Sequence, residues 1–353
     1  MLRTITLVCQ PALDACHSLQ TSLILWLCEA TRVAADVTAA NLRALHASPI
    51  VGDWLVAFLN KEHKEKTLLS RAITIAALSV TEKNSLVCWL DASNNTANQF
   101  QNPPPAWPIK PVCSDDGWNA VKELLIEFYN KGLGEGVPFD QNGDPVAAGG
   151  VNRQSFADAF KAEHGERSCI LCDGPFVSPE VDHWIAKKHF PGLSTASHNL
   201  IPICHDCNKR ANKGEKPVWD NAGNAFDEWF HPVFRSAHGC FEPRHQMTQI
   251  KIMPTAVEHT ERVKRLDRLI NLSSRWTSEF KMQTRSYKNS LRGQIRRGSI
   301  QATTVDIGSE LQELQLKIAD ENPPEANNII RNLTLTIMQE PAKLEALLTE
   351  LTT

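Results

Sequence analysis

Apolar residues recur at helical spacing through most of the first hundred positions of the chain. Leu13, Leu19, Leu23 and Leu27 recur at roughly helical spacing, the last three of them four residues apart. Apolar side chains that share one face of a helix are typical of a helix packed on a core. The pattern therefore predicts a mainly helical region over residues 1–100, with a short strand at residues 86–90.

The middle of the chain alternates between helix breakers and amphipathic segments. Residues 101–112 contain five prolines, which cannot occupy a helix interior, and they predict a stiff linker. A helix is expected from Asp115 through Phe128. Glycines and prolines over residues 131–150 indicate a flexible loop, and a short helix is expected over residues 152–163.

The last third again shows helical periodicity. We expect a helix over residues 258–280 and two further helices on either side of Pro323 and Pro324. Together these patterns predict an α+β fold that is mostly helical. Three domains are predicted: a helical region at 1–150 that is a candidate partner-binding domain, a domain at 151–230, and a helical region at 231–353.

Composition places the chain among ordinary globular proteins. Of its 353 residues, 42% are hydrophobic and 22% are charged, both usual fractions for that class. No stretch approaches the roughly 18 consecutive apolar residues of a membrane span. We therefore expect a cytoplasmic protein that makes no membrane contact.

The positive charge is concentrated in one segment. The net charge of the chain is −3, yet residues 231–300 hold 14 basic and 5 acidic side chains, whereas residues 301–353 hold 3 and 9. Five basic residues are spaced by four, three, four and four positions, which would align them along one helix face. Such a stripe suits contacts with nucleic-acid phosphates, or alternatively a solvated face or one paired with the acidic tail. Its members are Lys281, Arg285, Lys288, Arg292 and Arg296.

Four of the ten cysteines form two C-x-x-C pairs separated by 31 residues. The pairs are Cys169 with Cys172, and Cys204 with Cys207. Paired thiolates at such spacing can supply four tetrahedral ligands to one Zn²⁺ ion. Because the set is closed, the metal would be structural and would hold together a segment that has little apolar core of its own.

Polar residues of a second kind lie between and just after these pairs. The sequence has Asp182-His183, then Asn199 sixteen residues after the histidine, then Asn208 directly after the last cysteine. Framed by the two cysteine pairs, this order resembles the HNH endonuclease family. The resemblance covers about 45 residues and implies a ββα-metal module, a β-hairpin followed by a helix that holds one divalent ion.

The resemblance also implies a role for each residue. His183 matches the general base that takes a proton from the attacking water. Asp182 and Asn208 match ligands of a catalytic Mg²⁺ or Mn²⁺ ion, and Asn199 matches the residue that supports the loop. Asn212 lies four residues after Asn208, on the same face of an expected helix, and is an alternative ligand.

These observations favour a metal-dependent endonuclease that hydrolyses phosphodiester bonds, with DNA favoured over RNA. An HNH module followed by arginine-rich helices is also similar to the PtuB-type effectors of Septu and retron antiphage systems. That similarity implies a role in bacterial antiphage defence beside a separate ATPase subunit. The alternatives are a non-catalytic, zinc-stabilised nucleic-acid-binding protein and an interaction subunit of an ATPase–nuclease complex.

Overall fold

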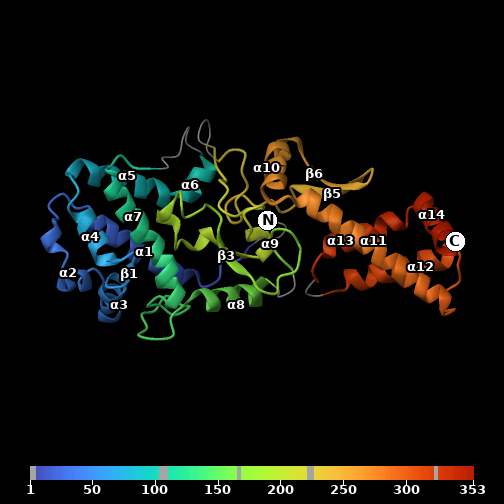
Figure 1. The fold of residues 1–353 in the computed structure, drawn as a ribbon, viewed down its shortest axis with the longest axis horizontal. Helices are drawn as coiled ribbons and strands as arrows, with labels where there is room; N and C mark the ends of the chain where they lie inside the picture. The colour runs from blue at the N-terminus through green and yellow to red at the C-terminus, as the bar shows by residue number, and fades with distance from the viewer. Residues whose placement is uncertain (1–4, 103–109, 165–167, 221–225, 322–324) are drawn as a thin grey trace.

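The computed structural model describes residues 5–102, 110–164, 168–220, 226–321 and 325–353. The molecule is elongated, with N-terminal helices at one end, tail helices at the other and a small hairpin module between them (Figure 1). Most of the predicted proline-rich linker, residues 103–109, lies outside the described residues, as do Pro323 and Pro324.

The N-terminal region is helical, as predicted, but the strand expected at residues 86–90 is wrong. Those residues lie within α5 (Val80–Asn94). Ser79 and Glu82 form a capping box at its start, which satisfies backbone N–H groups that a helix leaves free. The remaining helices of the region are α1 (Gln10–Leu27), α2 (Ala39–Arg43), α3 (Pro49–Leu59), α4 (Leu68–Ala76), α6 (Thr96–Gln101), α7 (Asp115–Glu127) and α8 (Arg153–His164).

Helix α7 continues into a turn that brings a tyrosine to the hairpin module. Ser114 caps the start of α7 by accepting a hydrogen bond from the Gly117 backbone N–H. At its other end, a π-helical turn, η2 (Phe128–Leu133), follows directly. Such turns shift the direction of the side chains after them. Tyr129 lies in this turn, and its hydroxyl donates to the backbone carbonyl of Val181 at 3.0 Å.

The central module is a hairpin followed by a short helix. Strands β3 (Glu180–His183) and β4 (Leu200–Ile203) are antiparallel, with Glu180 opposite Ile203 and His183 opposite Leu200. Two short 3₁₀ turns, η3 (Pro191–Leu193) and η4 (Ser197–Asn199), lie in the connection between the strands. Helix α9 (His205–Asn208) follows β4 after one residue, Cys204.

The C-terminal region begins with a hairpin that the sequence patterns did not indicate. Strands β5 (Phe241–Gln246) and β6 (Gln249–Pro254) pair antiparallel. The single helix expected over residues 258–280 is divided at Asn271, whose φ of 52° is left-handed and ends α10. The helices of this region are α10 (Thr260–Ile270), α11 (Leu272–Arg296), α12 (Thr304–Ala319), α13 (Asn328–Met338) and α14 (Pro341–Thr352).

The hydrophobic core of the hairpin module is completed by residues from the C-terminal region. Ile170, Trp184 and Ile201 are buried in one cluster together with Trp276 of α11 and Ile330 of α13. On the opposite side, Leu200 of β4 is buried in the core of the N-terminal helices. The module therefore buries apolar residues against both neighbouring regions, and both regions position it.

The predicted fold class is confirmed: the structure is mostly helical α+β, with small two-stranded hairpins and helical regions on both sides of the module. Among the described residues, no helix has both the length and the apolar character that a membrane span requires.

Candidate active site and cysteine cluster

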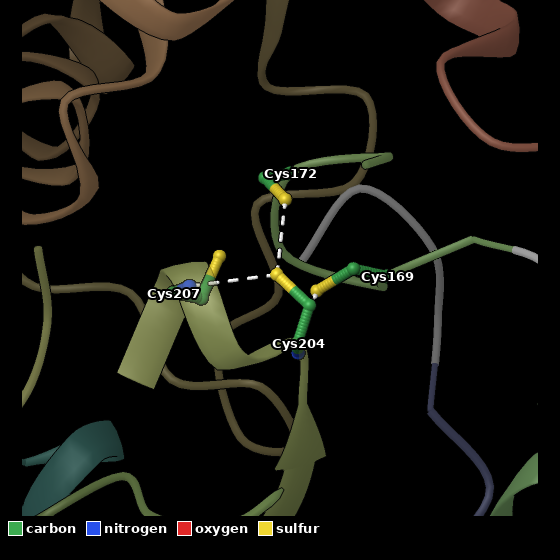
Figure 2. Close-up of side chains that lie close together, drawn as sticks. All are labelled: Cys169, Cys172, Cys204 and Cys207. Atoms are coloured by element: carbon green, nitrogen blue, oxygen red, sulfur yellow. Dashed lines mark hydrogen bonds between the residues drawn. The ribbon is translucent and has the colours of Figure 1, made fainter. Parts of the chain in front are cut away.

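The four paired cysteines come together at the end of the hairpin. Cys169 and Cys172 lie in a tight turn closed by a bond from the Asp173 N–H to the Cys169 carbonyl, with Asp173 in the left-handed region at φ 63°. Cys204 caps α9, which carries Cys207. All four sulfurs lie within 4.8 Å of one another and are buried, and Figure 2 shows them converging.

The cluster fits a tetrahedral zinc ion. Zinc–sulfur bonds of about 2.3 Å place two sulfurs of a tetrahedron about 3.8 Å apart. The Cys172 and Cys204 sulfurs are separated by 3.7 Å. Backbone N–H groups of Gly174, Cys204 and Cys207 also point at sulfurs, each at 3.4 Å. Such donors stabilise the thiolate form that binds metal.

The C-terminal helices hold the same cluster from outside. The Arg275 guanidinium donates to the Cys207 sulfur at 3.2 Å and to the Cys172 sulfur at 3.1 Å. The neighbouring Trp276 indole donates to the Cys172 carbonyl at 2.9 Å. The carboxylate of Asp173 accepts a bond from the Ile329 N–H in the first turn of α13 at 2.8 Å. The cluster is thus the point at which α11 and α13 attach to the module.

A pocket of about 280 Å³ opens beside β3 and contains three of the predicted site residues. Asp182, His183 and Asn208 all line it. The structure therefore brings together residues that are up to 26 positions apart in the sequence. The other lining residues are Val181, Ala186, Lys187, Lys188, Gly214 and Glu215.

The contacts of His183 fix its proton on one ring nitrogen. Its Nε2 lies 2.9 Å from the backbone carbonyl of Ser194. Because a carbonyl can only accept, Nε2 carries the hydrogen and Nδ1 keeps a lone pair in the neutral ring. Burial, together with the charges of Lys187 and Lys213, holds the pKa of His183 well below its usual value. A neutral ring with a free Nδ1 can accept a proton.

Asp182 forms a buried ion pair with a lysine from the turn after α9. The Lys213 ammonium lies 2.5 Å from Asp182 Oδ2, and its side chain is fully buried. It also donates to the carbonyls of His183 at 2.7 Å and Gly214 at 3.2 Å. Burial raises the pKa of Asp182, and Lys213 opposes this shift. Gly214 adopts a positive φ of 45°, a backbone conformation that a side chain would strain.

Asn199 holds the two ends of the loop between the strands. Its Oδ1 accepts a bond from the Ile185 N–H at 2.7 Å, and its Nδ2 donates to the carbonyls of Ile185 at 3.0 Å and Leu193 at 3.1 Å. The side chain is fully buried. Asn199 therefore lies behind the pocket and fixes the backbone just after His183.

A buried glutamine of the N-terminal region holds the same loop from the other side. Gln20 of α1 donates to the Gly192 carbonyl at 3.0 Å and accepts bonds from the hydroxyls of Ser194 and Thr195 at 3.1 and 2.8 Å. The Ser194 carbonyl is the partner of His183. Helix α1 therefore positions the group that orients the histidine.

The two predicted asparagine ligands have different surroundings. The Asn208 Nδ2 donates to Glu180 at 2.6 Å, and the same glutamate contacts His205. Asn212 does not share a helix face with Asn208, because α9 ends at Asn208. Its Oδ1 instead accepts a bond from Asn271 at 2.9 Å, and it is not among the residues that line the pocket.

The five basic residues of the predicted stripe all lie on α11, but part of the stripe is occupied. Lys288 forms an ion pair with Glu350 of α14, and Arg292 contacts the same carboxylate at 3.2 Å. This contact matches the alternative in which the face pairs with the acidic tail. Lys281 lies near the opposite end of the stripe and lines a separate groove.

Sequence patterns did not single out several residues that organise the site. Gln20 and Arg275 lie in helices far from the motif, and nothing in their local sequence marks them. Lys213 is not among the residues that carry the family resemblance. Its burial depends on the turn at Gly214. The Lys213-Gly214 pair after the second C-x-x-C is the one local sequence feature that could have pointed to this lysine.

Residues 169–214 match the HNH endonuclease family. Comparison with curated proteins and with solved structures gave no match to the chain. The matched residues contain the cysteine cluster, β3, β4, α9 and Lys213. The chain therefore contains an HNH endonuclease domain with a four-cysteine cluster.

Replacing one cluster thiol tests the structural metal. We expect Cys169→Ser to lower bound zinc from one ion per chain to nearly none and to lower the Tm, because three thiolates no longer close the site. Elemental analysis and thermal unfolding measure both. Cys240→Ser, outside the cluster, is the control and should keep its zinc. Full zinc occupancy in Cys169→Ser would contradict the assignment.

Replacing Gln20 tests the support of the loop. Gln20→Ala leaves buried hydroxyl and carbonyl groups without their partner, so we expect it to lower the free energy of unfolding by about 1–3 kcal/mol. Denaturant unfolding measures this difference. Gln10→Ala removes an exposed glutamine from the same helix and should change stability by less than about 0.5 kcal/mol. Equal effects of the two variants would argue against a special role for Gln20.

Proposed function

We propose that this protein is a metal-dependent endonuclease whose reaction takes place in the pocket formed by Asp182, His183 and Asn208. The carrying observation is the orientation of His183, whose Nε2 is bonded to the Ser194 carbonyl, so that the neutral ring keeps a lone pair on Nδ1. The match of residues 169–214 to the HNH endonuclease family supports phosphodiester hydrolysis as the reaction class.

The donors in the pocket fit a hard divalent cation. Asp182 offers a carboxylate, although its Oδ2 is also paired with Lys213. Asn208 offers an amide oxygen, because its Nδ2 is already donated to Glu180. Mg²⁺ and Mn²⁺ prefer oxygen ligands, and Mg²⁺ commonly takes one or two protein groups together with waters and phosphate oxygens. When bound, the ion would supply positive charge for the phosphate and the leaving oxygen.

The residues of the chain supply the proton transfer. In the proposed step, a water oxygen attacks phosphorus while His183 Nδ1 accepts a proton from that water. The bond between phosphorus and the 3′ oxygen breaks, and that oxygen takes a proton from solvent. The low pKa of His183 keeps the ring neutral and able to accept at neutral pH. Asn199 acts as a positioning residue, because it fixes the backbone beside His183.

Two cations beside the pocket suit an anionic substrate. Lys188 is exposed and Lys187 is half-buried, stacked over the Tyr129 ring at 4.1 Å. Burial and the nearby Arg153 lower the pKa of Lys187 to about 8. Both lysines line the pocket, and Lys188 is also paired with Glu215 at 3.2 Å. Contacts of these lysines and of the basic C-terminal segment with backbone phosphates do not distinguish DNA from RNA. The preference for DNA rests on the family resemblance alone.

The biological setting follows from the weaker resemblance. The similarity to PtuB-type effectors supports a role in antiphage defence, in which a separate ATPase subunit works beside the nuclease. In that setting, the N-terminal helical region would serve as the partner-binding domain. Its outer helices α2 and α3 lie away from the HNH domain, at the end of the molecule (Figure 1).

His183→Ala tests the proposed base. We expect the wild-type protein to nick or linearise supercoiled plasmid when Mg²⁺ or Mn²⁺ is added, and His183→Ala to lose at least about 100-fold in rate, because general-base catalysis contributes about that much or more. Gel electrophoresis measures the rate. Omitting the divalent ion is a better control than a chelator, which would also remove zinc from the cysteine cluster.

His189→Ala is the matched control, since this histidine lies in the same loop but packs edge-on against Trp219. It should cleave like the wild type. Retained cleavage by His183→Ala would refute the assigned base. DNA binding without cleavage under any divalent ion would instead favour a non-catalytic nucleic-acid-binding protein.

A further inference from the structure

A groove of about 620 Å³ runs along the C-terminal region, outside the HNH domain. Strand β6 and helices α10 and α11 form its walls. Its lining is rich in charged and hydroxyl side chains, among them Lys251, Arg268, Ser274, Ser278 and Lys281. Helices α12, α13 and α14 lie farther along α11 (Figure 1).

Three cations converge on the groove from three different elements. Lys251 comes from β6, Arg268 from α10 and Lys281 from α11, and all three are exposed. None of them forms an ion pair within the described residues, in contrast to Lys288 and Arg292 farther along α11. Positive charge that is not matched by an acid of the same protein is available to an anionic ligand.

The other charged residues of the groove are already engaged. Lys264 pairs with Glu261 one turn earlier in α10. Asp267 is the acidic lining residue, and both of its oxygens accept bonds from Ser273, one from the backbone N–H and one from the hydroxyl, each at 2.7 Å. Asp267 therefore holds the first turn of α11. Its single negative charge is outnumbered by the cations of the groove, which keeps a net positive charge.

The floor of the groove is rigid. The Ile250 N–H donates to the Thr277 hydroxyl at 2.9 Å, and the Ile252 N–H donates to the Ser273 hydroxyl at 3.2 Å. These bonds join the backbone of β6 to α11, and Ile250 is fully buried below them. The three cations are thus mounted on elements whose relative positions are fixed.

The groove adjoins the turn that carries the active-site lysine. Asn271 lines the groove and donates to the Ala211 carbonyl at 3.0 Å and to Asn212 Oδ1 at 2.9 Å. Lys216 donates to the Leu269 carbonyl at the end of α10. Ala211 and Asn212 therefore contact a residue of the groove wall, while Gly214 and Glu215 of the same turn line the pocket of Asp182 and His183.

We propose that this groove binds the phosphates of a nucleic-acid backbone through Lys251, Arg268 and Lys281 and leads the strand to the pocket. The inference rests on the proposed nuclease function, whose substrate it holds. Exposed lysines and arginines, with serine hydroxyls between them, are typical contacts to backbone phosphates and carry no base specificity. An extended polyanion fits them better than a small phosphate ester does, because the three cations are exposed and come from three different elements.

The test is the salt dependence of binding to a fluorescent 30-base-pair DNA duplex, followed by anisotropy without added divalent ion. We expect the triple variant Lys251→Ala/Arg268→Ala/Lys281→Ala to raise the Kd at least about tenfold. Its slope of log Kd against log salt concentration should fall by about 3, since each phosphate contact contributes about 0.9.

Two variants control for general effects. Lys66→Ala/Lys161→Ala/Lys317→Ala removes the same formal charge from β2 (Lys66–Thr67), α8 and α12 and should leave the slope unchanged. Lys251→Arg/Arg268→Lys/Lys281→Arg keeps the charges and should bind like the wild type. A triple alanine variant that keeps its thermal stability and the wild-type slope would overturn the proposal that the groove binds DNA.

Plasmid cleavage on the same proteins separates the two proposals. If the wild type cleaves and the triple alanine variant binds and cleaves equally well, the groove proposal fails and the nuclease stands. If the wild type binds DNA through the groove but never cleaves with Mg²⁺ or Mn²⁺, the groove stands and the nuclease fails.

Discussion

The four-sulfur cluster is the constraint on which the rest of the structure depends. The HNH domain has two four-residue strands and a helix of one turn, too little to bury a core of its own. The cluster ties Cys169 and Cys172, which precede the hairpin, to α9, which follows it. It also provides the sulfurs and carbonyl to which Arg275 and Trp276 of α11 bind. A zinc ion bound by the four sulfurs would therefore hold both the domain and its C-terminal support in place.

The pocket of Asp182, His183 and Asn208 depends on contacts from outside the HNH domain as well. The histidine is oriented by a carbonyl at Ser194, and Ser194 in turn is held by Gln20 and by the Leu125 carbonyl of α7. Tyr129 packs edge-on against the same ring at 4.3 Å. The N-terminal helices thus act as a scaffold for the loop. A change in these helices would reach His183 through the Ser194 carbonyl and the Tyr129 ring.

The sequence was most informative where spacing alone constrains chemistry. Two C-x-x-C pairs predict a tetrahedral cluster because adjacent turns leave the sulfurs few other arrangements, and the structure contains that cluster. Asp182, His183 and Asn208 were named from their order in the motif, and they line one pocket. The helical regions were predictable because apolar periodicity depends on local geometry.

Long-range contacts and single backbone angles were not predictable. Asn212 was expected on a helix face, but α9 ends after one turn, and the following turn buries Lys213 instead. The break at Asn271 depends on one left-handed residue inside an otherwise continuous amphipathic pattern. Residues 86–90 have apolar side chains that suit either a strand or a helix, and the capping box at Ser79 decided between them. The ion pairs of Lys288 and Arg292 with Glu350 could not be predicted, because they depend on where the C-terminal tail packs.

The central claim is that Asp182 and Asn208 hold a catalytic divalent ion next to His183. Its most direct test is titration of Mn²⁺ into zinc-loaded protein, followed by electron paramagnetic resonance, for the wild type and for Asp182→Asn. The account predicts one Mn²⁺ site per chain in addition to zinc, with affinity lowered at least about tenfold by Asp182→Asn. Unchanged Mn²⁺ binding in Asp182→Asn, or no Mn²⁺ site in the wild type, would contradict it.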